Sequence, residues 1–424
     1  MPVHTPREYL SALEYFGIKL GLEQIRALLE ALDHPDRAYP SLVIAGTNGK
    51  GSVTAMIERG LRAAGYRTGR YTSPHLVDIE ERVAIDGVSI SPALFDRAAG
   101  RVQVVAAALA QPPTFFEAAT AIALDAFRDA RVDAAVLEVG LGGRLDATNA
   151  VAPIGVAITS VDVDHQQYLG DTIEAIATEK AGVIKPGAIA VLGRNPPGVQ
   201  EIVRAACRAR GADYVYAPAA VDVDTHVEHG RAHLRRLTTA RRTIGDVTLA
   251  LAGRYQVDNA VTAVALLEAL AARGALTLPD DAVRTALNDV TWPARLEARR
   301  WRGHDILIDG AHNPAGAAAL ASYLDECYGR RLPMVVGVMR DKDAAGILRR
   351  LSPAASAWLC TAPTTARALD PEELARVAAD VAPDVPAMSI PTPADALERA
   401  CQCGTPAVVA GSLYLAGEIR ALTP

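Results

Sequence analysis

The chain has 424 residues and a formal net charge of −6, with 50% hydrophobic and 22% charged residues. This length predicts more than one domain, and the composition is that of an ordinary globular protein. The negative charge argues against a general nucleic-acid surface, so we expect no nucleic-acid partner. No apolar run reaches the roughly 18 residues of a membrane span, and we expect no membrane partner either.

The amino terminus, MPVHTPREYL, lacks the apolar core of a secretion signal, so a cytoplasmic location is the default expectation. Five cysteines are scattered along the chain, and Cys401 and Cys403 form a lone C-x-C pattern. Such a pattern is a weak metal signal, and disulfides are rare in the cytosol. We therefore interpret the cysteines as structural or incidental.

The first predicted helix begins at Pro6, because Thr5 and Glu8 form a T-x-x-E capping box, and it ends at Gly17. Beyond it, short apolar runs alternate with helical stretches. The runs are SLVIAG, YRTGRYTS, DAAVLEVG, GVAITSV and AIAVLG. This alternation predicts an α/β fold with a doubly wound, mostly parallel sheet.

Residues 221–252 interrupt this rhythm and read as short strands with a TIGD turn, followed by a long helix from Val257 to about Arg273. Near TWPARLE, residues 291–297, the strand-to-loop units begin again with HDILIDGAHN, LPMVVGVM, SAWLCTA and PAVVAGSLYL. We therefore expect a nucleotide-binding domain over residues 1–292. A second, smaller, Rossmann-like α/β domain is expected over residues 293–424.

A glycine-rich segment, VIAGTNGKGSVTAM, follows the first apolar run at residues 43–56. A strand that turns through glycines into a helix aims backbone N–H groups at one point, where an anion binds. Lys50 would reach the β- and γ-phosphates, and Ser52 would approach Mg²⁺, as in a P-loop. The spacing departs from the usual P-loop pattern, and a tight turn that needs glycine is the alternative. Phosphate binding leaves a switch, a kinase and a ligase open.

Other candidate residues follow predicted strands, at the edge where open parallel sheets carry their sites. Glu138 ends one strand, and His165 follows the next. With Ser73 in the TSPH loop they form a candidate Mg²⁺ site, although surface or packing roles are the alternative for each. Lys180 and Lys185, in ATEKAGVIKPG, are further candidates, and the alternative for each is an ordinary solvated surface lysine.

The motif DGAHNP, residues 309–314, places Asp309 and His312 just after a strand of the second domain. The alternative is a capped helix start, which Asn313 before Pro314 would suit. Arg295, near the proposed domain boundary, would cross to a phosphate as a bidentate donor, or simply lie at the surface.

Taken in order, these motifs resemble those of the folylpolyglutamate synthases and bifunctional dihydrofolate synthases, within the Mur-type ATP-dependent amide ligases. The resemblance rests on AGTNGKGS, TSPHL, ERV, FFEAAT, EVGLGGRLDATN, VDHQQYLG, EKAGVIKPG, WPARLE, LIDGAHNP, VVGVMRDKD and GSLYL, from about residue 8 to about residue 420. It implies an enzyme that joins L-glutamate to a folate-type carboxylate with ATP as co-substrate and Mg²⁺ as cofactor. Residues 194–250 contribute little to the resemblance.

Several site residues are implied by this resemblance. The nucleotide would be held by Thr47, Asn48, Gly49, Lys50, Gly51, Ser52, Asn259, Arg295 and Asp309. The metal would be held by Ser73, Glu138 and His165. Lys180 matches a lysine that the family carries as a carbamate, and we expect catalytic roles for Lys50, Lys180 and His312.

The resemblance also implies where the other substrates bind. The pteroate group would contact Lys19, Leu20, Gly21, Leu22, Thr114, Phe115, Phe116, Glu117, Leu145, Asp146 and Ala147. L-Glutamate would sit between the domains, near His312 and Ser412. The expected partners are these small molecules alone, acting on a monomer.

Three readings remain open at this point. The first is ligation of glutamate, either to both dihydropteroate and reduced folates or to reduced folates only. The second is a Mur ligase that uses a UDP-sugar, which would need an additional domain before the glycine loop. The third is a nucleotide-dependent switch, which would not need a second α/β domain carrying DGAHNP.

Overall fold

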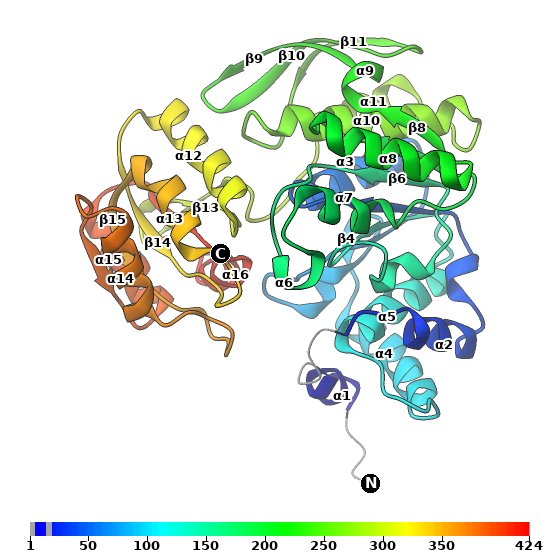
Figure 1. The fold of residues 1–424 in the computed structure, drawn as a ribbon, viewed down its shortest axis with the longest axis horizontal. Helices are drawn as coiled ribbons and strands as arrows, with labels where there is room; N and C mark the ends of the chain where they lie inside the picture. The colour runs from blue at the N-terminus through cyan, green and yellow to red at the C-terminus, as the bar shows by residue number, and fades with distance from the viewer. Residues whose placement is uncertain (1–4, 14–18, 424) are drawn as a thin grey trace.

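The computed structural model describes residues 5–13 and 19–423, which form two α/β domains side by side (Figure 1). The Thr5 capping box is confirmed, because the Glu8 N–H donates to Thr5 Oγ1 at 3.3 Å and the Thr5 N–H donates to Glu8 Oε2 at 2.8 Å. The predicted end of this helix at Gly17 lies outside the described residues. Within residues 5–13 and 19–423, no helix has the length and apolar character that a bilayer crossing requires.

The larger domain is built on an eight-stranded sheet with the order β4-β3-β2-β5-β1-β6-β7-β8. Six neighbouring strands, from β2 to β8, are parallel, and β3 and β4 extend one edge in antiparallel pairing. The strands are β1 Ser41–Ala45, β2 Thr68–Tyr71, β3 Val83–Ile85, β4 Val88–Ser89, β5 Ala134–Glu138, β6 Gly155–Ile158, β7 Ile189–Leu192 and β8 Asp213–Tyr216.

Helices cover both faces of this sheet, which confirms the doubly wound α/β fold. One face packs against α1 Pro6–Leu13, α2 Glu23–Ala31, α4 Pro92–Ala106, α5 Phe115–Ala130, α7 Ile173–Ala181 and α8 Pro197–Arg210. The other packs against α3 Lys50–Ala63, α9 Ala217–Ala220, α10 Gln256–Ala272 and α11 Asp280–Asn288. Shorter elements are α6 Gln166–Leu169 and the 3-10 helices η2 Pro35–Arg37, η3 Ile79–Arg82 and η4 Ala147–Ala150.

A separate three-stranded antiparallel sheet lies over α9, α10 and α11, at the top of Figure 1. Its strands are β9 Asp222–Glu228, β10 Arg231–Thr238 and β11 Thr243–Thr248. The prediction of a TIGD turn is wrong, because these four residues lie in β11 and the connection to β10 comes just before them. Ile244 and Val247 of β11 are buried, and their side chains stabilise this strand on the large domain.

The smaller domain is a six-stranded sheet with the order β12-β13-β17-β14-β15-β16, in which only the pairing of β12 with β13 is antiparallel. Its strands are β12 Glu297–Trp301, β13 His304–Ile308, β14 Leu332–Val336, β15 Ala355–Cys360, β16 Ala387–Ser389 and β17 Ala407–Ala410. Its helices are α12 Pro314–Tyr328, α13 Ala344–Leu351, η5 Ser352–Ala354, α14 Pro371–Val381, α15 Pro393–Cys403 and α16 Leu413–Ala421.

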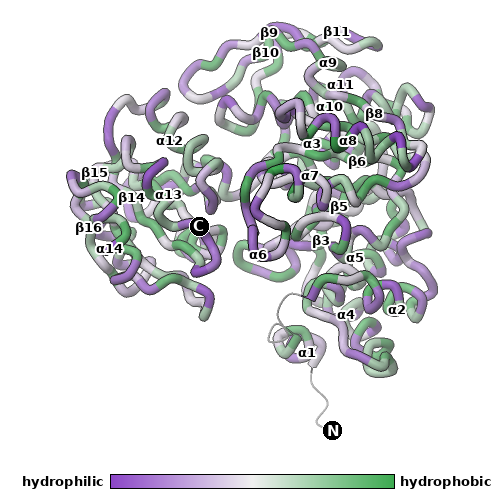
Figure 2. Tube along the Cα trace, in the orientation of Figure 1, coloured by the Kyte–Doolittle hydropathy of each residue, from purple (hydrophilic) through white to green (hydrophobic). Residues whose placement is uncertain are grey.

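Each domain has its own interior. Hydrophobic segments run through the inside of both domains, and hydrophilic segments gather along their outlines (Figure 2). The predicted boundary between Trp292 and Pro293 falls between the end of α11 and the start of β12. Its position along the chain stays a prediction, although the two sheets lie on either side of it.

The two domains meet at the carboxyl ends of their parallel strands. Asn313, just after β13, donates hydrogen bonds to Asn48, just after β1, and to Asp164, which follows β6. Open parallel sheets carry their sites at this edge, and the fold brings two such edges together.

Candidate active site

The glycine loop follows β1 and runs directly into α3. Gly46 and Gly49 have φ angles of 146° and 85°, in the region that favours glycine. A Cβ atom on Gly49 would clash with the side-chain oxygen of Asn259 on α10. The loop can therefore pack on α10 only because Gly49 has no side chain, and α3 begins immediately afterwards at Lys50.

Lys50 folds back over this loop. Its ammonium donates hydrogen bonds to the carbonyl oxygens of Gly46 and Thr47, both at 3.1 Å. Burial lowers the pKa of Lys50, and the carboxylates of Glu138 and Asp164 oppose that shift. An ammonium held by two neutral carbonyls can exchange them for phosphate oxygens, which are stronger partners.

A hydrogen-bonded chain connects α3 with α10 beneath the loop. Gln256 donates to the hydroxyl of Ser52 at 3.3 Å, and Asn259 donates to Gln256 at 2.8 Å. In the same turn of α3, a Cβ on Gly51 would lie 2.6 Å from the indole nitrogen of Trp292. The first turn of α3 is thus held between α10 and the segment that leads to the second domain.

Glu138, the last residue of β5, is only 6% exposed. Its carboxylate accepts a hydrogen bond from the backbone N–H of Ser73 at 3.4 Å. Burial raises the pKa of Glu138, and the positive charges of Lys50 and Arg295 oppose that rise. The structure therefore brings Ser73 and Glu138 together, close to the charges that flank the glycine loop.

His165 belongs to a charged cluster formed by both domains. Lys342, in the loop before α13, lies 2.5 Å from Asp164 Oδ1 and 3.1 Å from His165 Nε2. Burial acts to raise the pKa of Asp164, but the positive groups of His165 and Lys342 outweigh it and hold that pKa below its usual range. Burial lowers the pKa of His165 to about 4, so its imidazole is neutral near pH 7.

The DGAHNP segment caps a helix, as its sequence allows, and it also contacts the large domain. Asn313 caps α12 by accepting from the Gly316 N–H at 2.8 Å, and its amide group also reaches the large domain. His312, partly buried, has Nδ1 2.8 Å from the carbonyl of Gly310 and Nε2 3.9 Å from Asp164. Burial lowers the pKa of His312 to about 4, which leaves a neutral base facing the large domain.

Asp309 and Arg295 lie at the same strand end. Both carboxylate oxygens of the buried Asp309 accept backbone hydrogen bonds, from Leu296 at 3.0 Å and from Ala311 at 2.9 Å. Arg295 donates to the carbonyl of Ala294 at 2.8 Å. Asp309 therefore fixes the backbone that presents Arg295 toward the space between the domains.

Lys180 lies beneath the glycine loop and is not a surface lysine. It is 4% exposed, in α7, and its amine donates to the carbonyl of Gly46 at 2.8 Å. Burial, followed by the nearby Lys50, lowers the pKa of Lys180 to about 7. Lys185, by contrast, donates to the carbonyl of Asn149 at 2.9 Å.

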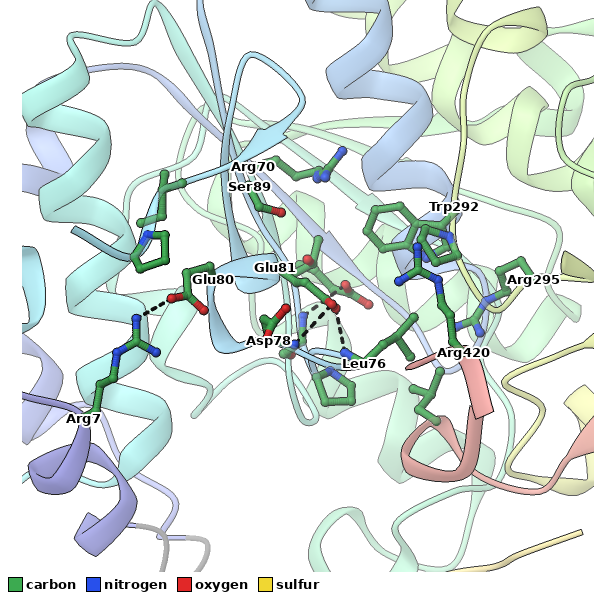
Figure 3. Close-up of a pocket in the computed structure, with 18 of the residues that line it drawn as sticks. Arg7, Arg70, Leu76, Asp78, Glu80, Glu81, Ser89, Trp292, Arg295 and Arg420 are labelled. Carbon is green, nitrogen blue, oxygen red and sulfur yellow. Dashed lines mark hydrogen bonds and ion pairs between the residues drawn. The ribbon is translucent and has the colours of Figure 1, made fainter. Parts of the chain in front are cut away.

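A cavity of about 770 Å³ opens between the two domains beside Glu138 and Ser73. Figure 3 shows guanidinium groups around it, Arg7 and Arg70 from the large domain and Arg295 and Arg420 from the side of the second domain. The same view shows Asp78, Glu80 and Glu81 among the side chains that line it, with Glu80 paired to Arg7. A cavity of this size is typical of a small-molecule site, and its lining combines cationic with acidic side chains.

The three segments expected to hold the pteroate group lie at neighbouring elements. Residues 19–22 lead into α2, residues 114–117 begin α5, and residues 145–147 lead into η4, and these three elements contact one another. The middle segment forms a capping box, in which Thr114 and Glu117 bond each other's backbone N–H groups. Asp146 caps η4 by accepting from the Thr148 N–H at 3.0 Å. The capping roles explain part of this sequence without any ligand.

Ser412 caps α16 by accepting from the Tyr414 N–H at 3.0 Å, directly after β17. The preceding Gly411 N–H donates to the carbonyl of Ala311 at 2.8 Å. Ser412 and His312 therefore follow adjacent strand ends of the small domain.

Sequence reasoning missed the residues that connect the domains. Asp164 and Lys342 received no role, and Asn313 was interpreted only as a helix cap. Asp164 carried a signal, because it directly precedes His165 at a strand end. Lys342 lies in VVGVMRDKD, one of the motifs of the resemblance, but nothing in the sequence indicated its pairing with Asp164, 178 residues away.

Comparison with known proteins agrees with this architecture. Residues 44–267 match the family described as the Mur ligase middle domain. Residues 294–413 match the family described as the Mur ligase, glutamate ligase domain. The two matches correspond to the large sheet with its glycine loop and to the six-stranded sheet.

Among individual relatives, the dihydrofolate synthase/folylpolyglutamate synthase of Mycobacterium tuberculosis is 40% identical over 85% of this chain and 78% of its own length. A structure of Mycobacterium tuberculosis folylpolyglutamate synthase with ADP superposes with a TM-score of 0.91, at 36% identity, over 99% of this chain and 98% of that one. A bifunctional folylpolyglutamate synthase/dihydrofolate synthase with Mn, AMPPNP and L-glutamate superposes with a TM-score of 0.84, at 31% identity, over 99% and 98%.

Proposed function

This chain belongs to the dihydrofolate synthase/folylpolyglutamate synthase family of Mur ligases, and from that membership we propose its reaction. It is an ATP-dependent amide ligase that joins L-glutamate to the carboxylate of 7,8-dihydropteroate and to the γ-carboxylate of reduced folates. The products are the amide, ADP and phosphate. The observation that carries this proposal is the meeting of the glycine loop with the DGAHNP strand end through Asn48 and Asn313.

The chemistry explains why ATP is consumed. A carboxylate resists attack by an amine, because it is negatively charged and oxide is a poor leaving group. Transfer of the γ-phosphoryl group to a carboxylate oxygen gives an acyl phosphate and ADP. The glutamate amine then attacks the acyl carbon, the bond to the phosphate oxygen breaks, and the amine loses a proton.

Lys50 is assigned to the phosphoryl groups. Its contacts with two loop carbonyls support this role, because phosphate oxygens are stronger partners for the same ammonium. A charge fixed at the transferring group needs no rearrangement during the reaction. Asn259 and Ser52, bridged by Gln256, keep the first turn of α3 in place beneath the nucleotide. Thr47, Gly51, Arg295 and Asp309 complete the proposed nucleotide contacts.

Mg²⁺ is the proposed metal, with Ser73, Glu138 and His165 as its protein ligands. A buried carboxylate whose backbone hydrogen bond is long, at 3.4 Å, is a suitable donor for a divalent cation. His165 is neutral near pH 7, as a ligand must be, and binding would require its Nε2 to leave Lys342. When bound, the ion would neutralise phosphate charge during transfer.

The cavity between the domains is the proposed site for the reacting carboxylate and for L-glutamate. Its arginines suit the two carboxylates of glutamate, and His312 and Ser412 follow adjacent strand ends of the small domain. His312, neutral near pH 7, is the proposed acceptor of the amine proton. Closure of two domains over this cavity would exclude water, which hydrolyses acyl phosphates.

The pteroate group is assigned to the segments 19–22, 114–117 and 145–147, because α2, α5 and η4 contact one another. Lys180 is proposed to act as a carbamate beneath the glycine loop. We further propose that residues 1–292 and 293–424 are the two domains and that the enzyme works as a cytoplasmic monomer.

The test is ADP release with each acceptor separately. We expect release with dihydropteroate plus L-glutamate, with a reduced folate plus L-glutamate, and not when either partner is omitted. Activity with reduced folates alone would restrict the function to folylpolyglutamate synthesis. ADP release without an acceptor would contradict ligation. In the Glu138→Gln variant, the Mg²⁺ concentration needed for half activity should rise.

A further inference from the structure

The outer face of the β9–β10 hairpin carries three potential metal ligands, His226, Glu228 and His233. The two histidines are direct cross-strand partners, and their rings stack with centroids 5.0 Å apart and an interplanar angle of 18°. Glu228 lies two residues beyond His226 and therefore on the same face. One ligand atom from each of the three residues lies within 4.8 Å of the other two.

The alternation of the strand explains why these residues gather on one side. Ala232 and Leu234, on either side of His233, are fully buried against the large domain. His226 and Glu228 are exposed, and His233 is partly exposed. The polar face thus carries two imidazoles and one carboxylate that the hydrophobic core does not require.

His233 is held in an orientation that leaves one nitrogen available. Its Nδ1 lies 2.9 Å from the hydroxyl of Thr248, its cross-strand partner on β11. A hydrogen bond to one ring nitrogen fixes the imidazole plane and points the other nitrogen away, as the outer partners of metal-bound histidines do.

We propose that His226, Glu228 and His233 bind a borderline divalent cation of the Zn²⁺ class. Two imidazoles and one carboxylate are an established three-ligand set for Zn²⁺, with water at the fourth position. Bonds of about 2.0–2.2 Å require the ligand atoms to approach one another more closely than they do here. Small rotations of exposed side chains provide that movement without a change in the strands.

The position of this site gives it a structural consequence. The turn that joins the two strands contains Gly230, where a Cβ would clash with Tyr323 and Cys327 of α12. Gly230 also accepts a backbone hydrogen bond from Gly253 at 2.8 Å. Figure 1 shows this end of the hairpin reaching toward α12. A cation that ties β9 to β10 would stiffen the turn that contacts the small domain.

Zn²⁺ binding to the full, tag-free chain tests the proposal by calorimetry and by metal analysis after dialysis. We expect the wild type to bind one more equivalent than His226→Ala, whatever the Mg²⁺ site takes up. The matched control is His304→Ala, which removes an exposed hairpin histidine from the small domain and should keep the full stoichiometry. Equal stoichiometry in wild type and His226→Ala would overturn the proposal.

A second variant separates coordination from a general effect on the hairpin. Thr248→Val keeps the shape of the side chain and removes the hydroxyl that orients His233. It should retain the equivalent but weaken its affinity by about 10-fold. Melting curves without metal should be the same for wild type, His226→Ala and Thr248→Val, since both mutated side chains are exposed. If both His226→Ala and Thr248→Val bound Zn²⁺ with the affinity of the wild type, the site would again be rejected.

Discussion

Lys180 has surroundings that suit a chemistry unlike that of a solvated lysine. Its pKa of about 7 leaves roughly half of the amine neutral at pH 7, whereas a free lysine near 10.4 is almost entirely protonated. A neutral amine can attack CO₂ to give a carbamate and release one proton. We expect ¹³CO₂ to label the wild type, as detected by NMR, and the labelled fraction to rise as the pH rises through about 7.

The same residue offers an activity test. Lys180→Ala should lose the labelled carbamate and most activity, and short carboxylates such as acetate should restore part of that activity. Lys185→Ala, in the same sequence segment, should keep the label. An unlabelled wild type together with an active Lys180→Ala enzyme would refute the carbamate.

Lys50 folds back over the glycine loop and is the cation proposed to bind the phosphoryl groups. Lys50→Ala removes a preorganised charge from phosphoryl transfer, and losses of this kind typically reduce kcat by on the order of 10²–10³. Steady-state ADP release measures the loss. The far-UV circular dichroism spectrum should stay that of the wild type. A variant with nearly full kcat would show that Lys50 has another role.

At the scale of residues, the sequence predicted those that stand beside a motif and missed those defined by a partner far along the chain. Glu138 and His165 could be proposed because each follows an apolar strand. Lys342 could not, because its environment consists of Asp164 and His165 from the other domain. Burial was equally hidden for Lys180, whose solvated alternative was as consistent with the sequence as its position beneath Gly46.

At the scale of elements, the glycine loop offers a matched comparison. Gly49→Ala places a Cβ at φ 85° and against Asn259, whereas Gly65→Ala places one at φ 92° with no atom within 4 Å. In both variants, backbone strain should lower the free energy of unfolding by about 1–2 kcal/mol. Only Gly49→Ala should also disturb the loop, and we expect its KM for ATP to rise at least tenfold.

Denaturation and ATP kinetics of the two variants distinguish these effects. Gly65→Ala should be destabilised while its KM for ATP stays that of the wild type. Equal KM values in the two variants would mean that contact between the loop and α10 does not matter for nucleotide binding.

The strands predicted from apolar runs are present, including β1, β5, β6, β13 and β17. β1, β5, β6 and β17 are buried along their whole length, so their sequences are nearly continuous apolar runs, whereas β13 begins with the exposed His304 and Asp305. No run predicted β3, β4, β8, β12 and β16. All of these except β3 lie at sheet edges, and β3 lies next to the edge strand β4. Edge strands are short or polar because one side faces solvent, and their sequences resemble loops.

At the scale of the whole molecule, three partly buried histidines link stability to pH. Burial lowers the pKa of His75, His165 and His312 to about 4 each, from about 6.5 in an unfolded chain. Between these values the unfolded state binds more protons, so the free energy of unfolding falls as the pH drops from about 6.5 to about 4. Urea titrations across this range should show His75→Gln with a shallower slope than the exposed control His304→Gln. Parallel slopes would contradict this linkage.

One buried ion pair, between Lys342 and Asp164, contributes to the contact between the domains. The side chains of Lys342 and Asp164 are 8% and 9% exposed, and removal of one partner of such a pair costs about 3–5 kcal/mol because the other charge stays buried. In Lys342→Ala, the unpaired Asp164 destabilises the arrangement of the domains in which the glycine loop faces Asn313. We expect kcat/KM for ATP to fall by on the order of 10², and the radius of gyration with nucleotide, measured by X-ray scattering, to increase. Arg331→Ala is the control, because it breaks an exposed pair with Asp384 in the same domain. If both variants kept the wild-type kcat/KM and radius, the ion pair would not hold the domains together.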